Sequence, residues 1–190
     1  MKHIATAVAV ILSSSGICAA QAADGTISFV GVVTASTCKV EAGTAPGSNN
    51  PDFRLDLGTV STSAMNNDST NRRSATQAFN VYVGGPGGNC PATTARTASV
   101  RLDAKPGTVG AGFLPNTAGT GGADNVGVVI LNPAGDEVNM AVGWTTPAQA
   151  VDDTTAATFN FWGALKGYGA ANSSTAGPLA ADMTYTVMYQ

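Results

Sequence analysis

Apolar side chains recur at every second position along much of this chain, and that spacing limits its fold more than any other feature. In an extended strand alternate side chains point to opposite faces, so a segment with this spacing lines a core with one face. No segment keeps a helical period for three turns, and Thr62–Asn67 is predicted to form one helical turn at most. The alternating segments are 27–33, 53–57, 79–83, 98–102, 159–165 and 183–189, and Val126–Leu131 is a continuous apolar run typical of a buried strand.

Turn signals separate these segments. Clusters of Gly, Pro, Asn and Ser lie at residues 46–51, 84–88, 119–122 and 132–136. Several short strands with this punctuation predict an all-β fold, an antiparallel immunoglobulin-like β-sandwich. The sequence shows no linker and no internal repeat, so we expect one folded domain.

The first 22 residues have the features of a secretory signal peptide. Lys2 and His3 form a short basic start, Ile4–Leu12 is apolar or small throughout, and Ala20–Ala22 supplies a small-x-small cleavage pattern. A membrane anchor is a weaker interpretation, because polar residues interrupt the apolar segment before it reaches the length of a bilayer. We therefore expect Ala23 to be the first residue of the exported protein.

Two of the three cysteines lie outside this leader, at Cys38 and Cys90. An even pair in a protein sent to an oxidising compartment is typical of a structural disulfide. In the chain-entropy model, a bridge that closes a loop of roughly 53 residues contributes about 4 kcal/mol of stability. A reactive or metal-binding thiol pair is disfavoured, since neither cysteine has a neighbouring histidine or a CxxC spacing.

Ionisable groups are scarce, which excludes several classes of function. Charged residues make up 11% of the chain, and its one histidine is His3, within the leader. An exported chain without imidazole has no Ser-His-Asp triad, no Cys-His dyad and no zinc site with a histidine ligand. With a formal net charge of −3 and no basic stripe, nucleic acid is not an expected partner. We predict no enzymatic activity, no cofactor and no metal site.

The remaining motifs with chemical potential are better interpreted as structure. Asp136–Glu137 and Asp152–Asp153 are acid pairs that we expect to lie in solvated loops. Residues 84–88 lack the Lys-Ser/Thr of a phosphate-binding loop, and Asp124–Asn125 has too few acids nearby for a calcium loop. Both are predicted to be turns. A tryptophan in a sandwich belongs more often to the core or its rim than to a sugar-binding face, and this interpretation applies to Trp144 and Trp162.

Both ends of the exported chain have the pattern of good strands, although chain ends usually fray. The N-terminal strand pattern runs over 26–33, and the last one continues to the final residues of the chain. One explanation is that the two ends pair within the monomer. The other is that the domain stops one strand short, and that the N-terminal segment completes a neighbouring molecule by strand addition.

Five stretches of the sequence, in order, resemble the major subunits of type 1-like fimbriae, which are assembled by the chaperone–usher pathway. The resemblance covers the whole exported chain and both of its cysteines. The stretches are GTISFVGVVTASTCKV (25–40), LDLGTVSTSAM (55–65), FNVYV (79–83) before Cys90, VGVVILNPAGDEV (126–138) and ADMTYTVMYQ (181–190).

The resemblance implies an incomplete sandwich that lacks its final strand and carries an N-terminal donor strand. It divides the chain into a signal peptide at 1–22, a donor-strand extension at 23–34 and a pilin domain at 35–190. An incoming donor strand fills a hydrophobic groove beside the last strand of its neighbour. In this chain the donor residues would be Ile27, Phe29, Gly31 and Val33, and the acceptor edge would comprise Met183, Tyr185, Val187, Tyr189 and Gln190.

The resemblance also implies partners and a location. A periplasmic chaperone would hold the C-terminal strand and the carboxylate of Gln190, and an outer-membrane usher would exchange the chaperone for the next subunit. The product would be a surface fimbria that supports cell adhesion, with any host receptor bound through a separate tip subunit. Two alternatives remain open: a minor adaptor or terminator subunit of the same kind, and a monomeric secreted β-sandwich that binds a ligand.

Overall fold

The computed structural model describes residues 38–47, 50–66, 73–90, 96–105, 112–170 and 172–190. The predicted signal peptide and the predicted donor residues Ile27, Phe29, Gly31 and Val33 lie outside these ranges. Among the described residues, no helix has the length and apolar character needed to cross a membrane.

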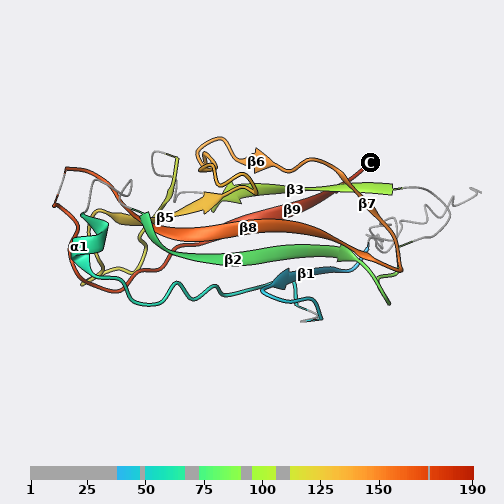
Figure 1. The fold of residues 1–190 in the computed structure, drawn as a ribbon, viewed down its shortest axis with the longest axis horizontal. Coiled ribbons are helices and arrows are strands. Elements are labelled where there is room, and N and C mark those ends of the chain that lie inside the picture. The colour runs from blue at the N-terminus through green and yellow to red at the C-terminus, as the bar shows by residue number, and fades with distance from the viewer. Residues whose placement is uncertain (1–37, 48–49, 67–72, 91–95, 106–111, 171) are drawn as a thin grey trace, which may run out of the picture. The chain divides into compact units, whose positions relative to one another are not determined.

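One sheet of the sandwich has five strands in the order β1-β2-β8-β5-β4, all antiparallel to their neighbours (Figure 1). Its two long central strands, β2 and β8, pair over most of their length, with a bulge between Ser74 and Gln77. The sheet is closed on each side by shorter strands. The strand bounds are β1 Val40–Gly43, β2 Arg73–Gly84, β8 Ala156–Gly167, β5 Val126–Leu131 and β4 Leu114–Pro115.

The second sheet is built around β3 (Arg96–Ala104). On one side β3 pairs with two short strands, β6 (Trp144–Thr145) and β7 (Gln149–Val151). On the other side it pairs along seven residues with β9 (Met183–Tyr189). Figure 1 shows β3 and β9 side by side in the layer above β2 and β8.

The core lies between the sheets and consists of the inward side chains that the two-residue period predicts. On β3 the alternate residues Ala98, Val100 and Leu102 are fully buried. On β8, Phe159 and Phe161 are equally enclosed, and the ring of Phe161 meets Trp144 of the opposite sheet edge-on at 6.2 Å between centroids. The all-β sandwich predicted from the sequence is thus confirmed.

The outer face of the five-stranded sheet carries a smaller apolar cluster. Val129, Leu131 and Ala164 are buried there, with Trp162 and Phe113 packed against them. Both tryptophans therefore lie in or beside apolar clusters, as expected.

Several elements were not evident in the sequence pattern. The strands β1, β4, β6 and β7 are too short to show a period of two. The helical turn expected at Thr62–Asn67 is present as α1 (Thr62–Met65), and Ser61 caps it by accepting a hydrogen bond from the N–H of Ala64.

The strand predicted at 53–57 is only partly correct. Leu55 and Leu57 are half-buried and Arg54 and Asp56 are exposed, as expected, but Phe53, which the pattern placed on the inward face, is exposed. However, no described strand forms a ladder with this segment.

The predicted disulfide is present and joins Cys38 to Cys90, across a sequence separation of 52. It links the residues before β1 to the loop after β2. At the end of β2, the backbone of Gly84 lies close to both Asp152 and Cys90. A Cβ at Gly84 would lie 2.4 Å from the carbonyl oxygen of Asp152 and 3.0 Å from Sγ of Cys90. The position also has a φ of +84°, so both backbone conformation and space favour glycine.

This close approach gives a prediction about stability. Gly84→Ala should lower the free energy of unfolding by about 2–4 kcal/mol, because alanine is strained at positive φ and its Cβ collides with backbone. Gly119→Ala is the matched control, since Gly119 has a φ of +75° but no atom within 4 Å of a built Cβ. The Gly119→Ala control should lower the free energy of unfolding, measured with urea, by about 1 kcal/mol. Equal losses for the two variants would show that the contact with Asp152 does not matter.

Candidate functional site

The strand edges of this sandwich differ sharply in how well they are protected. On the five-stranded sheet, β4 is two residues long and ends in Pro115, and β1 has four residues. On the second sheet, Pro147 separates the short strands β6 and β7. Short edge strands and proline both hinder pairing with another chain. Of the four edges formed by the described strands, three are therefore poor templates for strand addition.

The fourth edge belongs to β9, which has none of these features. β9 is seven residues long, contains no charged residue and no proline, and pairs on one side with β3 over its whole length. No described strand pairs with its other side. A long, uncharged edge of this kind is a ready template for another strand.

The inward side chains of β9 are only partly covered. Met183, Tyr185, Val187 and Tyr189, which we call the β9 row, pack against the main core but remain half-buried, while Thr184 and Thr186 are exposed. On β3, one strand further in, the corresponding side chains are fully buried. The burial of the core therefore falls from complete to partial at β9.

A second half-buried row lies on the extended segment 53–60. Leu55, Leu57 and Val60, which we call the leucine row, pack against the same core as the β9 row. Leu55 fits against β8 because Gly163 has no side chain: a Cβ there would lie 2.9 Å from Cδ2 of Leu55. At the start of the segment Phe53 is 40% exposed, which is unusual for a large apolar residue in this structure.

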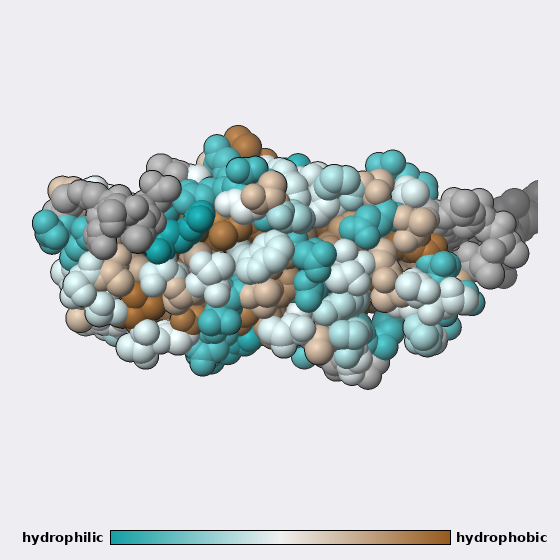
Figure 2. All heavy atoms as spheres, viewed as in Figure 1, coloured by the Kyte–Doolittle hydropathy of each residue, from teal (hydrophilic) through white to brown (hydrophobic). Residues whose placement is uncertain are grey.

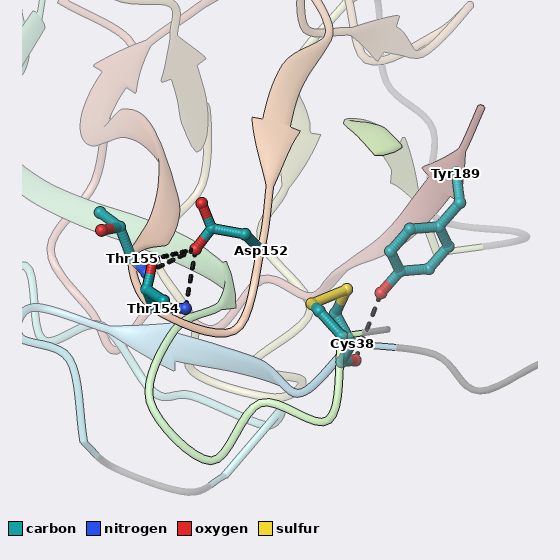
Figure 3. Close-up of a disulfide and its surroundings, with 6 residues drawn as sticks. Cys38, Asp152, Thr154, Thr155 and Tyr189 are labelled. Atoms are coloured by element: carbon teal, nitrogen blue, oxygen red, sulfur yellow. Dashed lines mark hydrogen bonds between the residues drawn. A yellow bond between two sulfur atoms is a disulfide. The ribbon is translucent and has the colours of Figure 1, made fainter. Parts of the chain in front are cut away.

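Two tyrosine side chains of the β9 row extend to the backbone at the beginning of the chain's described part. The hydroxyl of Tyr185 donates to the carbonyl oxygen of Pro51 at 2.7 Å, just before the leucine row. The hydroxyl of Tyr189 donates to the carbonyl oxygen of Cys38 at 3.3 Å (Figure 3). Burial, together with the negative charge of Asp52, raises the pKa of Tyr185 above its usual value, so this hydroxyl stays protonated as a donor.

The hydrogen-bond pattern of β9 fixes the direction of its backbone groups. Thr97 and Gln190 exchange both of their backbone hydrogen bonds, at 3.1 and 2.9 Å. In an antiparallel pair, such residues alternate with residues whose N–H and C=O point the other way. The backbone groups of Met183, Tyr185 and Val187 therefore point to the side of β9 that faces away from β3. These residues carry both an apolar side chain toward the core and backbone groups toward that edge.

Figure 3 shows the disulfide between the end of β9 and a tight turn. In that turn Asp152 accepts hydrogen bonds from the N–H of Thr155 and from the hydroxyl and N–H of Thr154, each at 2.7 Å. These bonds lower the pKa of the exposed Asp152 carboxyl. Its carboxylate is thus used by its own turn, which agrees with the interpretation of Asp152–Asp153 as a solvated loop.

The other residues considered for chemistry have local structural roles. Glu137 is exposed, and its carboxylate accepts a hydrogen bond from Nζ of Lys166 at 2.6 Å. The guanidinium of Arg73 forms a second ion pair with this carboxylate, at 3.7 Å. Residues 84–88 and Asp124–Asn125 form turns, as predicted. Within the described ranges, no three His, Cys, Asp or Glu side chains are grouped as metal ligands. A shallow hollow of about 230 Å³ is lined by Gly112, Phe113, Val129, Glu137, Val138, Asn139 and Lys166.

The surface visible in Figure 2 shows apolar side chains in small patches among polar ones. The most distinctive feature of the described chain is therefore the β9 edge with its two half-buried rows. A long strand edge that no other described strand covers is a template on which another strand can be added.

The comparisons with known proteins identify the family. The sequence profile of the fimbrial protein family matches residues 27–190, so this chain belongs to the fimbrial protein family. It is therefore a structural subunit of a fimbria, as the five sequence stretches predicted. Subunits of this family polymerise with other subunits into a surface fimbria. A comparison with curated protein sequences found no match.

Solved structures agree with the fold. The P pilus rod subunit PapA has a TM-score of 0.55 at 17% identity, over 80% of this chain and 99% of that one. A chaperone–usher pilus, in a structure that addresses rod uncoiling, has a TM-score of 0.54 at 19% identity, over 88% of this chain and 96% of that one. The CupB6 tip adhesin of Pseudomonas aeruginosa has a TM-score of 0.58 at 20% identity, over 80% of this chain and 38% of the adhesin. The predicted pilin fold is thereby confirmed.

The tyrosine contact gives a prediction about this edge. Tyr185→Phe keeps the ring but removes the hydrogen bond to Pro51, and should lower the free energy of unfolding by about 1 kcal/mol. Thr186→Val is the matched control on the exposed side of the same strand and should change stability by less than about 0.5 kcal/mol. Urea unfolding of the two variants beside the parent measures the difference. A Tyr185→Phe variant as stable as the control would mean that the hydroxyl contact contributes nothing.

Proposed function

We propose that this chain polymerises by donor-strand exchange, with β9 as the acceptor strand and residues 27–33 of another copy as the donor. The observation that carries the proposal is the β9 edge: a long, uncharged strand that pairs on one side and whose inward side chains are half-buried. An added strand would satisfy backbone groups along that edge and cover the β9 row and the leucine row at once.

The donor segment has the composition that this edge requires. Ile27, Phe29 and Val33 are large apolar residues at alternate positions, so one face of an added strand would present all three. Burying side chains of this size contributes roughly 1.5–3 kcal/mol each. Backbone pairing along the strand adds to this, so the assembled contact should dissociate very slowly.

The same edge explains the proposed partners. An unprotected strand beside uncovered core residues is prone to aggregation, so a newly exported subunit needs a temporary partner. A periplasmic chaperone that adds a strand along Met183–Gln190 would supply it, and an outer-membrane usher would be where the next copy displaces the chaperone. We infer that the chain's role is structural and involves no catalysis. A signal peptide at residues 1–22 would route it to the periplasm.

The test is polymer formation by the full chain, expressed with a chaperone of this class. Removing residues 23–33 should abolish SDS-resistant polymers, while the shortened subunit still binds the chaperone. Phe29→Asp should lower the polymer yield at least about tenfold, since it places a charge in the covered face. Ser28→Asp is the matched control, because the neighbouring position faces outward, and it should assemble close to the parent level.

Two results would contradict the proposal. A full-length chain that stays a stable monomer without any chaperone would instead favour a monomeric secreted binding protein. Polymers that persist after removal of residues 23–33 would show that another segment joins the subunits. Mass spectrometry of the main band in surface filaments would separate a rod subunit from a minor adaptor or terminator.

A further inference from the structure

We infer that Asn116 fixes the register of β9 on β3 and thereby determines which residues form the acceptor edge. The inference rests on the proposed donor-strand exchange and deepens it, because it assigns a positioning residue to the acceptor strand. It starts from an ambiguity in the apolar pattern of the chain before β9.

The apolar pattern alone does not fix where β9 pairs with β3. The alternation of the β9 row continues toward the N-terminus through Leu179 and Ala181, which also pack against the main core. A shift of β9 by two residues would still turn apolar positions toward the core, because the side-chain period of a strand is two. Ala181 would then face Ala104, which faces Met183 in the structure. The ladder would keep its length in this arrangement, which we call the slipped register.

Asn116 holds the chain just before β9 by its side-chain amide. It directly follows β4, which belongs to the other sheet. Its Nδ2 donates to the carbonyl oxygens of Ala123 at 2.8 Å and Pro178 at 3.0 Å. Its Oδ1 accepts from the N–H groups of Ala118 and Ala180, each at 3.0 Å. Both hydrogens and both lone pairs of the amide are therefore used, one of each on the chain that leads into β9.

The neighbouring Thr117 strengthens the hold on Ala180. Its N–H donates to the Ala180 carbonyl oxygen at 2.8 Å, and its hydroxyl donates to the same oxygen at 3.1 Å. Only two residues separate Ala180 from Met183, where β9 begins. A shift of two residues moves a strand by about 7 Å, so the slipped register would pull Ala180 away from these partners. The bonds at Asn116 and Thr117 therefore favour the observed register.

The register decides which side chains a donor strand would meet. In the slipped register each residue of β9 would take the place of the residue two positions later, so Tyr185 would occupy the place of Val187. The two tyrosine contacts of the observed register would also be broken. A donor strand that fits one arrangement would meet side chains of different size in the other. Loss of the Asn116 amide should therefore impair assembly more than an equal loss of stability elsewhere.

Asn66 provides a matched control, because it holds the same connection further from β9. Its Nδ2 donates to the Ser174 carbonyl oxygen at 3.4 Å, and its Oδ1 accepts from the Ser174 N–H at 3.0 Å. In Figure 1 the connection between β8 and β9 runs around the end of the sandwich that carries α1. Residues 175–182 still separate this contact from β9, so Asn66→Ala should lower stability while the bonds at Asn116 keep the register.

Pairs of cysteines report the register in the full chain, expressed with its chaperone. Ser99 faces Met188 in the observed register and would face Thr186 in the slipped one. Directly opposite residues lie within reach of a disulfide, whereas the diagonal separation of about 7–8 Å is too long. In the parent chain, Ser99→Cys should therefore crosslink with Met188→Cys and not with Thr186→Cys.

The decisive comparison adds Asn116→Ala or Asn66→Ala to these chains. Asn116→Ala should raise the crosslinked fraction of the 99–186 pair at least about tenfold, because it removes four hydrogen bonds that favour the observed register. In the chain without added cysteines it should lower the yield of SDS-resistant polymer about tenfold. Asn66→Ala should leave both quantities close to the parent, although urea unfolding shows a loss of stability. If Asn116→Ala does not accumulate, Asn116→Ser replaces it.

Three outcomes would overturn the inference. An equal rise of the 99–186 crosslink in both variants would show that any loosening of the connection releases β9. A parent-like crosslink pattern in Asn116→Ala would show that the ladder holds its register without this amide. A shifted register with normal polymer yield would show that assembly does not depend on it. Donor-strand exchange itself fails on a different result, the persistence of polymers in the chain without residues 23–33.

Discussion

The one-sided pairing of β9 with β3 is the interaction on which the rest of this structure depends. It holds the last strand of the sandwich in place along seven residues, and it directs the backbone groups of Met183, Tyr185 and Val187 away from β3. Because the same residues turn apolar side chains toward the core, a strand added there gains hydrogen bonds and apolar burial together. In the proposed assembly, the same strand edge would contribute to the stability of the fold and to the contact between subunits.

The remainder of the sandwich keeps other edges from competing with β9. Pro115 ends β4, and Pro147 separates β6 from β7. Between β6 and β7, the N–H of Thr146 donates to the carbonyl oxygen of Val100, and its hydroxyl accepts from the N–H of Val100, in place of a regular ladder. Such interruptions discourage edge-to-edge association in the wrong place. At the end of β9, the disulfide and the Tyr189 contact hold the start of β1 close by, so this region is constrained where a new strand would enter.

The sequence predicted the parts of this protein that repeat a local pattern. Val100 and Leu102, Phe159 and Phe161, and the β9 row all lie on the faces that the two-residue period assigned to them. Features that depend on contacts between distant segments were not predictable. The Tyr185–Pro51 hydrogen bond joins residues 134 positions apart, and the absence of a ladder at 53–57 depends on what lies beside that segment. A two-residue strand such as β6 carries no period at all.

A high-resolution structure of the assembled filament tests the central claim most directly. The account predicts that residues 27–33 of one copy form a strand along Met183–Tyr189 of the next. The β9 row and the leucine row should then be buried to the same degree as the inward side chains of β3. A filament in which each copy covers its own β9 with its own residues 27–33, or in which subunits join through β1, β4 or β6, would contradict it.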